Sequence, residues 1–259
     1  MSEIQADTNL NIDNQNLNTG VFVYCLHKSA SMFLYKLFKD WSQQTNFTYF
    51  SSNLSSSQPE QLTQEINTNF CLCPCRHFDL HQEEYPNASE IFHILQIRDP
   101  RDILVSQYFS FGWIHTDKDW DDAKKAERER IRNMEIDDYV LLDEKDTRPY
   151  LLSIHLNQLL SQLDNQKEDK IILVKYEEMV TDLKQWLSKV IKPFGFENES
   201  EVINQTYDKY IHQFQVTEET MTHRRKITPG DHLEKLKPET IEKLNSKYLE
   251  VLNRFNYSI

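Results

Sequence analysis

The sequence predicts an α/β fold, a single domain in which helices flank a central parallel β-sheet. Short apolar runs have the length and composition of buried parallel strands, at residues 21–26, 69–75, 91–97 and 171–175. Longer segments have helical periodicity, at residues 31–43, 100–111, 120–145, 149–164, 180–193 and 238–254. Because the two kinds of segment alternate along the chain, the strands should be parallel, with helices on both faces of the sheet.

The composition suits one domain with a substantial core. The chain has 259 residues, of which 39% are hydrophobic, and the domain is assigned to residues 19–259. Residues 1–18 are rich in Asn, Asp, Gln and Thr and are expected to form a disordered tail. The sequence has no signal peptide and no apolar stretch near eighteen residues, which predicts a cytoplasmic protein without membrane association.

A polar turn joins the first predicted strand to the first predicted helix. It contains Lys28 and Ser29, and the helical pattern begins near Met32. A strand, a turn and a helix in this order aim backbone N–H groups at an anion, and Lys28 adds a full positive charge. The chain has only four glycines, and none forms the dinucleotide-binding fingerprint or the Walker A loop. The turn therefore predicts a site for a phosphate-like or sulfate-like group, although such a turn can also be a plain connection.

A second strand leads into a helix at residues 91–109. Arg98 ends this strand, Asp99 is a natural N-cap, and Pro100 suits the first helical position. Open α/β sheets bind ligands at the carboxyl ends of their strands, so Arg98 and Ser106 could reach the same anion. The alternative is that Arg98 pairs with Asp102 and that Ser106 is buried filler.

Two further segments complete the pattern. Arg224, Arg225 and Lys226 are consecutive cations in a chain whose net charge is −12, although such a run often forms only a solvated loop. The tetrapeptide that begins at Tyr176 follows the apolar run at residues 171–174.

Together these segments resemble the sulfotransferases that use 3′-phosphoadenosine 5′-phosphosulfate (PAPS). That family's motif Y-P-K-S-G-T-T-W is matched around Lys28 and Ser29, and its Y-E-[DE]-[ML] at residues 176–179. Its motif R-[DN]-P-[RK]-D-x-x-x-S is matched from Arg98 to Ser106, and R-K-G-x-x-G-D in part from Arg225 to Asp231. The four motifs occur in the family's order and cover roughly residues 20–235.

The resemblance implies a P-loop-like strand–loop–helix that binds the phosphosulfate of PAPS, with 3′-phosphoadenosine 5′-phosphate (PAP) as product and no metal. It implies that His77, in a segment similar to the family's K-T-H-[LF], is the catalytic base, and that Lys28 and Ser106 are also catalytic. The implied cofactor-binding residues are Lys28, Ser29, Ala30, Ser31, Met32, Phe33, Arg98, Ser106, Tyr176, Arg225, Lys226 and Ile227.

The chain departs from the family at four of these places. Ala30 replaces the loop glycine, so the loop should do without a positive φ there. Phe33 replaces the Trp that stacks on adenine, and a smaller ring should give somewhat less than the roughly 1–3 kcal/mol of base stacking. Ile227 replaces a glycine, and Cys75 replaces the family's lysine.

Alternating cysteines precede His77 and suggest a zinc site at first sight. On a strand, Cys71, Cys73, Cys75 and His77 share one face, but the first and last are then about 20 Å apart. Zinc ligands all lie within about 2.3 Å of the metal, so the cysteines are expected to be small apolar core residues in a reducing compartment.

The acidic balance bears on the partners. It disfavours nucleic acid and polyanionic acceptors, and favours a small neutral or cationic acceptor such as a specialised metabolite. The family's dimer motif is not matched after Asp231, so the oligomeric state stays open. The alternatives are a kinase-like phosphoryl transferase, which would need a metal and a glycine-rich loop, and a non-catalytic nucleotide-binding module.

Overall fold

The computed structural model describes residues 19–51, 69–76, 91–115, 120–164, 168–215 and 225–259. The expected tail at residues 1–18 lies outside this part of the chain, as does His77. The described residues contain a five-stranded parallel sheet of order β2-β3-β1-β4-β5, so the predicted α/β fold is confirmed. Its strands are β1 (Gly20–Cys25), β2 (Thr48–Phe50), β3 (Phe70–Cys75), β4 (Ile91–Ile97) and β5 (Ile171–Lys175). The sequence did not predict β2, because three residues are too few to show a pattern.

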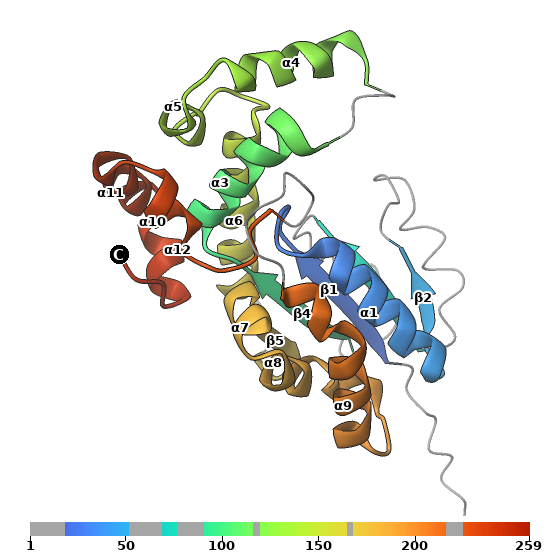
Figure 1. The fold of residues 1–259 in the computed structure, drawn as a ribbon. Coiled ribbons are helices and arrows are strands. Elements are labelled where there is room, and N and C mark those ends of the chain that lie inside the picture. The colour runs from blue at the N-terminus through green and yellow to red at the C-terminus, as the bar shows by residue number, and fades with distance from the viewer. Residues whose placement is uncertain (1–18, 52–68, 77–90, 116–119, 165–167, 216–224) are drawn as a thin grey trace, which may run out of the picture.

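Helices cover both faces of the sheet (Figure 1). One face packs on α1 (Ser31–Gln44), α7 (Tyr176–Thr181), α8 (Leu183–Val190) and α9 (Glu199–Tyr210). The other packs on α3 (Pro100–Phe109), α6 (Arg148–Asp164) and the C-terminal helices α10 (Asp231–Lys235), α11 (Pro238–Lys247) and α12 (Leu249–Arg254). Alternate side chains of β1 enter the two cores, with Val21 and Val23 in the first and Phe22 and Tyr24 in the second. Both faces are therefore buried, which explains the continuous apolar runs.

Several predicted helices are shorter than expected because polar residues interrupt them. Residues 120–145 form α4 (Asp122–Arg132) and α5 (Ile136–Val140), separated where the Asn133 side chain bonds the carbonyl of Glu129. Asp182 separates α7 from α8 and caps α8 by accepting from the Gln185 N–H. Helix α9, which begins at the N-cap Asn198, was not predicted.

Short helical turns complete the described elements. They are η3 (Ser110–Ile114), a π-helical turn that continues α3, and the 3₁₀ turns η4 (Glu168–Lys170), η5 (Lys192–Phe194) and η6 (Ile211–Phe214). None of the helices within the described ranges has the length and apolar character needed to cross a bilayer.

An irregularity in β3 changes the direction of its last side chains. Phe22 of β1 pairs with Leu72, but Tyr24 pairs with Cys75, so β3 contains one additional residue between these pairs. Cys71 and Cys73 consequently pack in the core beside α1, whereas Cys75 packs in the opposite core. The expectation that the cysteines share one face of the strand is wrong, because a one-residue shift reverses the faces.

The carboxyl ends of the strands meet at one edge of the sheet, where the candidate site lies. Lys28, Arg76, Arg98 and Tyr176 follow β1, β3, β4 and β5 respectively. The topology thus gathers segments that are distant in the sequence.

Candidate active site

The loop after β1 contains two non-glycine residues with positive φ. Lys28 has a φ of 71° and Ala30 a φ of 65°, both in the left-handed region. The turn is tight, because the Ser29 N–H donates to the Leu26 carbonyl and the Ala30 carbonyl accepts from the N–H groups of Phe33 and Leu34. The expectation that the loop avoids a positive φ at Ala30 is wrong, since closing this turn directly before α1 imposes that conformation. An L-residue in this region loses roughly 1–2 kcal/mol relative to glycine.

Ala30→Gly is therefore expected to stabilise the protein. The gain in the free energy of unfolding should be up to about 1 kcal/mol, because glycine relieves the strain but gives a more flexible unfolded chain. Urea denaturation measures it. Ala126→Gly, at an exposed position inside α4, is the matched control and should lower stability by about 1 kcal/mol. Equal losses in the two variants would contradict the strain at Ala30.

The ammonium group of Lys28 lies in a largely buried position. Its Nζ donates to the Ser110 Oγ at 2.8 Å. Burial, followed by the positive charges of Arg98 and Arg76, lowers the pKa of Lys28 to about 8. Ser110 was missed in the sequence, although its spacing of four residues from Ser106 places the two hydroxyls on one helical face.

Arg98 supports the loop from the end of β4. Its guanidinium donates to the Lys28 carbonyl at 2.7 Å and lies 4.2 Å from the centre of the Tyr176 ring. Burial acts to lower its pKa, but Tyr176 and nearby carboxylates outweigh burial and raise it. The Arg98 Nε is buried without a hydrogen-bond partner in the described part of the chain, so one donor is left for a ligand.

Asp102 binds the segment that contains the third motif. Its carboxylate accepts from the Gly230 N–H at 2.8 Å and from the His232 N–H at 3.0 Å, and it lies 2.6 Å from the His232 Nδ1. Burial alone would raise the pKa of Asp102, but the hydrogen bonds from His232 and the charge of Arg98 hold it at about 2. Asp102 therefore fixes residues 230–232 against α3.

Arg225 and the side chain of Lys226 are buried and ion-paired. Arg225 pairs with Asp231 and stacks over the Phe109 ring, 4.0 Å from its centre. Lys226 lies 3.4 Å from Asp231 and 2.6 Å from Glu234. The solvated-loop alternative does not hold for these two residues. The Ile227 carbonyl accepts from the Tyr176 hydroxyl at 3.0 Å, which joins the segment to β5 and α7.

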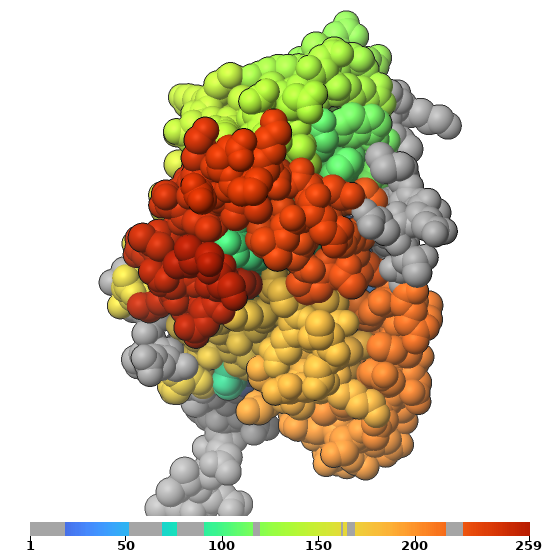
Figure 2. Space-filling model, turned by 60° about the vertical axis from the view of Figure 1, so that its left-hand side comes forward, coloured from blue at the N-terminus to red at the C-terminus, as the bar shows by residue number. Residues whose placement is uncertain are grey.

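A second set of hydrogen bonds and ion pairs supports the elements that carry the site. Glu177 accepts from the Asp99 N–H at 2.9 Å and from the Tyr257 hydroxyl at 3.0 Å. Arg101 pairs with Asp99 and donates to the Ser258 carbonyl at 2.7 Å. In Figure 2 the C-terminal segment, in red, covers the surface between α7/α8, in yellow, and α4/α5, in yellow-green.

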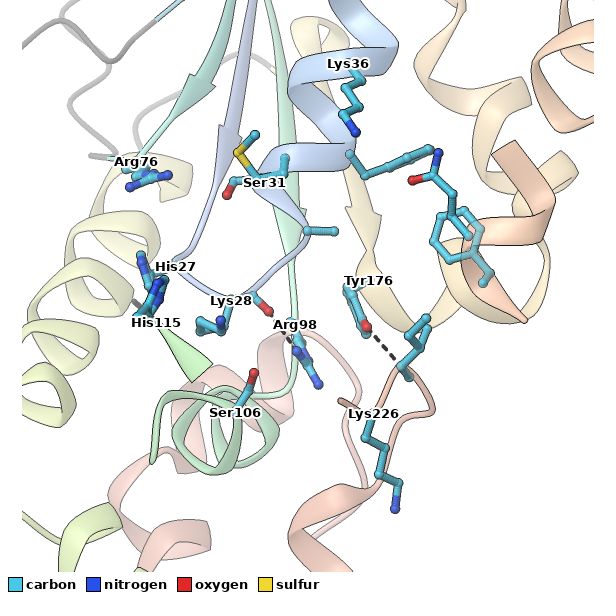
Figure 3. Close-up of a pocket in the computed structure, with 16 residues that line it drawn as sticks. His27, Lys28, Ser31, Lys36, Arg76, Arg98, Ser106, His115, Tyr176 and Lys226 are labelled. Carbon is cyan, nitrogen blue, oxygen red and sulfur yellow. Dashed lines mark hydrogen bonds between the residues drawn. The ribbon is translucent and has the colours of Figure 1, made fainter. Parts of the chain in front are cut away.

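These elements enclose a cavity of about 620 Å³ (Figure 3). It brings together most of the predicted site residues, namely Lys28, Ala30, Ser31, Met32, Phe33, Arg98, Ser106, Tyr176, Lys226 and Ile227. Ser29 and Arg225 are buried behind the cavity lining. The lining also includes residues that the sequence did not single out, namely His27, Lys36, Arg76, His115, Gln213 and Phe214. No signal in one sequence identifies them, because they come from five separate segments.

Phe33 borders the cavity as part of an aromatic group. Its ring is edge-on to Tyr210 at 5.5 Å and to Phe214 at 5.1 Å between ring centres. The ring is therefore fixed in place at the first turn of α1, and Tyr176 lines the same cavity.

The cysteines lie in the core, away from the cavity lining. Cys25, Cys71, Cys73 and Cys75 are buried and unpaired, and burial raises the pKa of each thiol. Across the described ranges, no three His, Cys, Asp or Glu side chains are grouped so that they could hold a metal ion.

Comparisons with known proteins identify the fold and the family. No curated protein sequence matches the chain. Mouse sulfotransferase SULT7A1, solved with PAP, is 15% identical with a TM-score of 0.54, over 91% of this chain and 85% of that one. A retinol dehydratase, solved with androsterone and PAP, is 11% identical with a TM-score of 0.53, over 91% and 81% of the two chains. At these identities the structures establish a shared fold. The model of the sulfotransferase domain matches residues 19–256, and the chain therefore belongs to the sulfotransferase family.

Proposed function

We propose that the chain transfers a sulfo group from PAPS to a hydroxyl or amine of a small-molecule acceptor. The observation that carries this is the convergence of Lys28, the first turn of α1, Arg98 and Ser106 on one cavity. The volume of about 620 Å³ lies within the range of cavities that bind small molecules. Sulfotransferases of the same fold have been solved with PAP, which supports PAPS as the donor.

The donor's groups match the positions of the lining residues. The 5′-phosphosulfate belongs beside Lys28 and the N–H groups of Ser31 and Met32, because the first N–H groups of a helix have no partner within it. The Ser29 N–H is already bonded to Leu26, so the available donors begin after it. The 3′-phosphate belongs near Arg98 and Ser106, where the Arg98 Nε is unpartnered among the described residues.

The adenine of the donor is proposed to lie at the opposite end of the cavity, near the remaining cationic residues of the site. The ring belongs between Phe33 and Tyr176, both of which line the cavity. Lys226 also lines the cavity, with its side chain ion-paired to Glu234, and Arg225 supports the segment from behind. Their contribution is to hold the backbone around Ile227 close to the nucleotide.

The proposed reaction is an in-line displacement at sulfur. The acceptor oxygen or nitrogen forms a bond to sulfur while the bond from sulfur to the bridging oxygen breaks, and the electron pair stays on the departing PAP. Lys28 stabilises the negative charge that develops on that oxygen, at the place where charge appears during the reaction. His77 is the proposed base for the acceptor's proton, a role typically worth about 10²–10⁴-fold in rate.

The acceptor is proposed to be a specialised metabolite that is modified in the cytoplasm. The unpaired, buried cysteines support a reducing compartment. A cavity bounded by α1, α3 and the segment after residue 225 suits a small molecule better than a polymer.

The protein should bind PAP in preference to ADP. PAP carries its second phosphate on the 3′ oxygen, whereas ADP carries it at the 5′ end. Each charge-assisted hydrogen bond to the 3′-phosphate contributes roughly 1.5–3 kcal/mol, so PAP should bind about 10–100-fold more tightly. Isothermal titration calorimetry with both nucleotides measures this. Equal affinities would remove the basis for PAPS, whereas PAPS-dependent addition of one sulfo group to an acceptor, seen by mass spectrometry, would establish the reaction.

A further inference from the structure

The cavity has a second cationic side, beyond Lys28. Arg76, His27 and His115 line it on the side of Lys28 away from Arg98 and Tyr176 (Figure 3). Arg76 directly follows β3, His27 lies between β1 and Lys28, and His115 follows η3. None of the described residues that line the cavity is Asp or Glu.

The ring of Phe111 holds the imidazole rings of His27 and His115 in position. The His27 ring stacks on Phe111 with 5.5 Å between ring centres, and the His115 ring stacks on it at 5.4 Å. The Arg148 guanidinium lies 4.7 Å from the centre of the same ring. We call His27, Arg76, His115 and Arg148 the histidine–arginine cluster. Arg128 of α4 donates to the Phe111 carbonyl, which holds η3 in this position.

The charges of described residues that act on His27 are all positive. Burial, together with the positive charges of Lys28, Arg76, Arg148 and His115, lowers the pKa of His27 to about 3. Its Nδ1 is buried without a hydrogen-bond partner among the described residues. No carboxylate in the described ranges forms an ion pair with Arg76, whereas Lys226 at the other end has two. Arg76 is an exposed cation, and the described residues that line the cavity beside it include no carboxylate, so this side of the cavity favours an anion.

We propose that the acceptor carries an anionic group, a carboxylate, phosphate or sulfate, and that Arg76 binds it while the hydroxyl faces Lys28. The proposal rests on the proposed sulfo transfer and names the class of its acceptor. It reverses the expectation of a neutral or cationic acceptor, which came from the net charge of −12. Charges separated by more than about 10 Å are largely screened in salt, so the lining of the cavity decides what binds there.

The donor does not require the histidine–arginine cluster. Lys28, the first turn of α1, Arg98 and Ser106 already face the proposed phosphosulfate and 3′-phosphate. Arg76 lies on the side of Lys28 away from Arg98 (Figure 3). With the donor in its proposed position, this is the side from which the proposed acceptor would attack sulfur in line. A guanidinium binds carboxylate, phosphate and sulfate through paired hydrogen bonds, so Arg76 can anchor an acceptor beside the reacting sulfur.

Matched acceptor pairs test the proposal. Calorimetry of the protein–PAP complex would compare 4-hydroxyphenylacetate with its methyl ester, an aliphatic hydroxy acid with its methyl ester, and phosphorylated and sulfated hydroxy compounds with their parent diols. The anionic member of each pair should bind with at least about tenfold higher affinity than its neutral partner. Weaker or equal binding of every anionic member would overturn the proposal.

Substitutions of Arg76 test whether this residue causes the tighter binding of anionic acceptors. Arg76→Gln should abolish the advantage of the anionic members, Arg76→Lys should restore part of it, and both should retain PAP affinity. Arg130→Gln, which removes an exposed partner of Glu144, is the control and should behave as the unmodified protein. A parallel loss of PAP affinity, or equal losses with acid and ester, would assign Arg76 to the donor and overturn the proposal.

The same measurements separate this proposal from the proposed reaction. Selective binding of the acids without PAPS-dependent sulfation would support the acceptor site and count against sulfo transfer. Sulfation of the esters in preference to the acids would support sulfo transfer and count against the anion-binding acceptor site.

Discussion

Replacing Lys28 with alanine should lower kcat by about 10²–10³-fold, the loss typical of removing a single donor that stabilises transition-state charge. The Lys28 Nζ is held by Ser110 at the cavity, where we propose that the bridging oxygen of the donor lies. A contact made mainly in the transition state lowers kcat and kcat/KM together, so PAP affinity should fall much less. Steady-state kinetics and PAP calorimetry measure both. A rise in KM for PAPS at unchanged kcat would make Lys28 a ground-state binding residue.

The pH dependence of PAP binding tests the charge of Lys28 independently of the kinetics. Its pKa of about 8 means that the ammonium is charged below this pH and neutral above it in the free protein. PAP affinity should therefore be flat from about pH 7 to 8 and then fall, by no more than the modest loss expected for Lys28→Ala, until the pH reaches the higher pKa of Lys28 in the complex. Lys28→Arg keeps its charge and should show no such fall. A flat profile to pH 10 in the unmodified protein would contradict the charge role.

Asp102→Ala should destabilise the protein by about 3–5 kcal/mol, because it leaves a buried His232 and two backbone N–H groups without their acceptor. PAP affinity should also fall, since residues 230–232 lose their attachment to α3. Urea denaturation and calorimetry measure the two effects. Asp143→Ala, which removes only the exposed pair with Lys247, should cost under about 1 kcal/mol. Similar losses in both variants would show that Asp102 does not anchor the segment.

The pKa of Asp102 also sets a pH window. The folded-state pKa of about 2 lies below the ordinary value, so the carboxylate contributes stability that is present above about pH 4. This contribution, on the order of 2 kcal/mol, is lost as the pH falls from about 4 through 2. The difference in stability between the unmodified protein and Asp102→Asn should shrink over that interval.

The sequence predicted the parts of the site that depend on local order. The apolar runs located four of the five strands in the described structure, and each ends close to a polar residue that faces the cavity. Asp99 caps α3 as expected, with Pro100 in its first turn. Lys28, Arg98 and Tyr176 could be selected because the motifs place them at or just after the carboxyl ends of strands, and Ser106 because its motif places it in the second turn of the helix that follows Arg98.

The remaining features depend on long-range packing. The shift of register in β3 cannot be predicted, because the apolar run has the same pattern with or without an additional residue. The positive φ of Ala30 follows from closing the turn between β1 and α1, against the preference of alanine itself. His115 belongs to no motif, and His27 and Arg76 stand at motif positions where the family has other residues, so only the meeting of β1, β3 and η3 brings the three to one cavity.

The bonds behind the site have a consequence for the order of folding. Arg101 and Ser258 are 157 positions apart, Asp102 and His232 are 130 apart, and Lys28 and Ser110 are 82 apart. Closing such long loops is entropically unfavourable until most of the chain is already collapsed, so these contacts should form late. An early folding intermediate could then contain helices and part of the sheet without any affinity for PAP. Recovery of PAP binding during refolding would follow the final docking of residues 225–259 onto α3 and α7, and would lag behind the recovery of secondary structure.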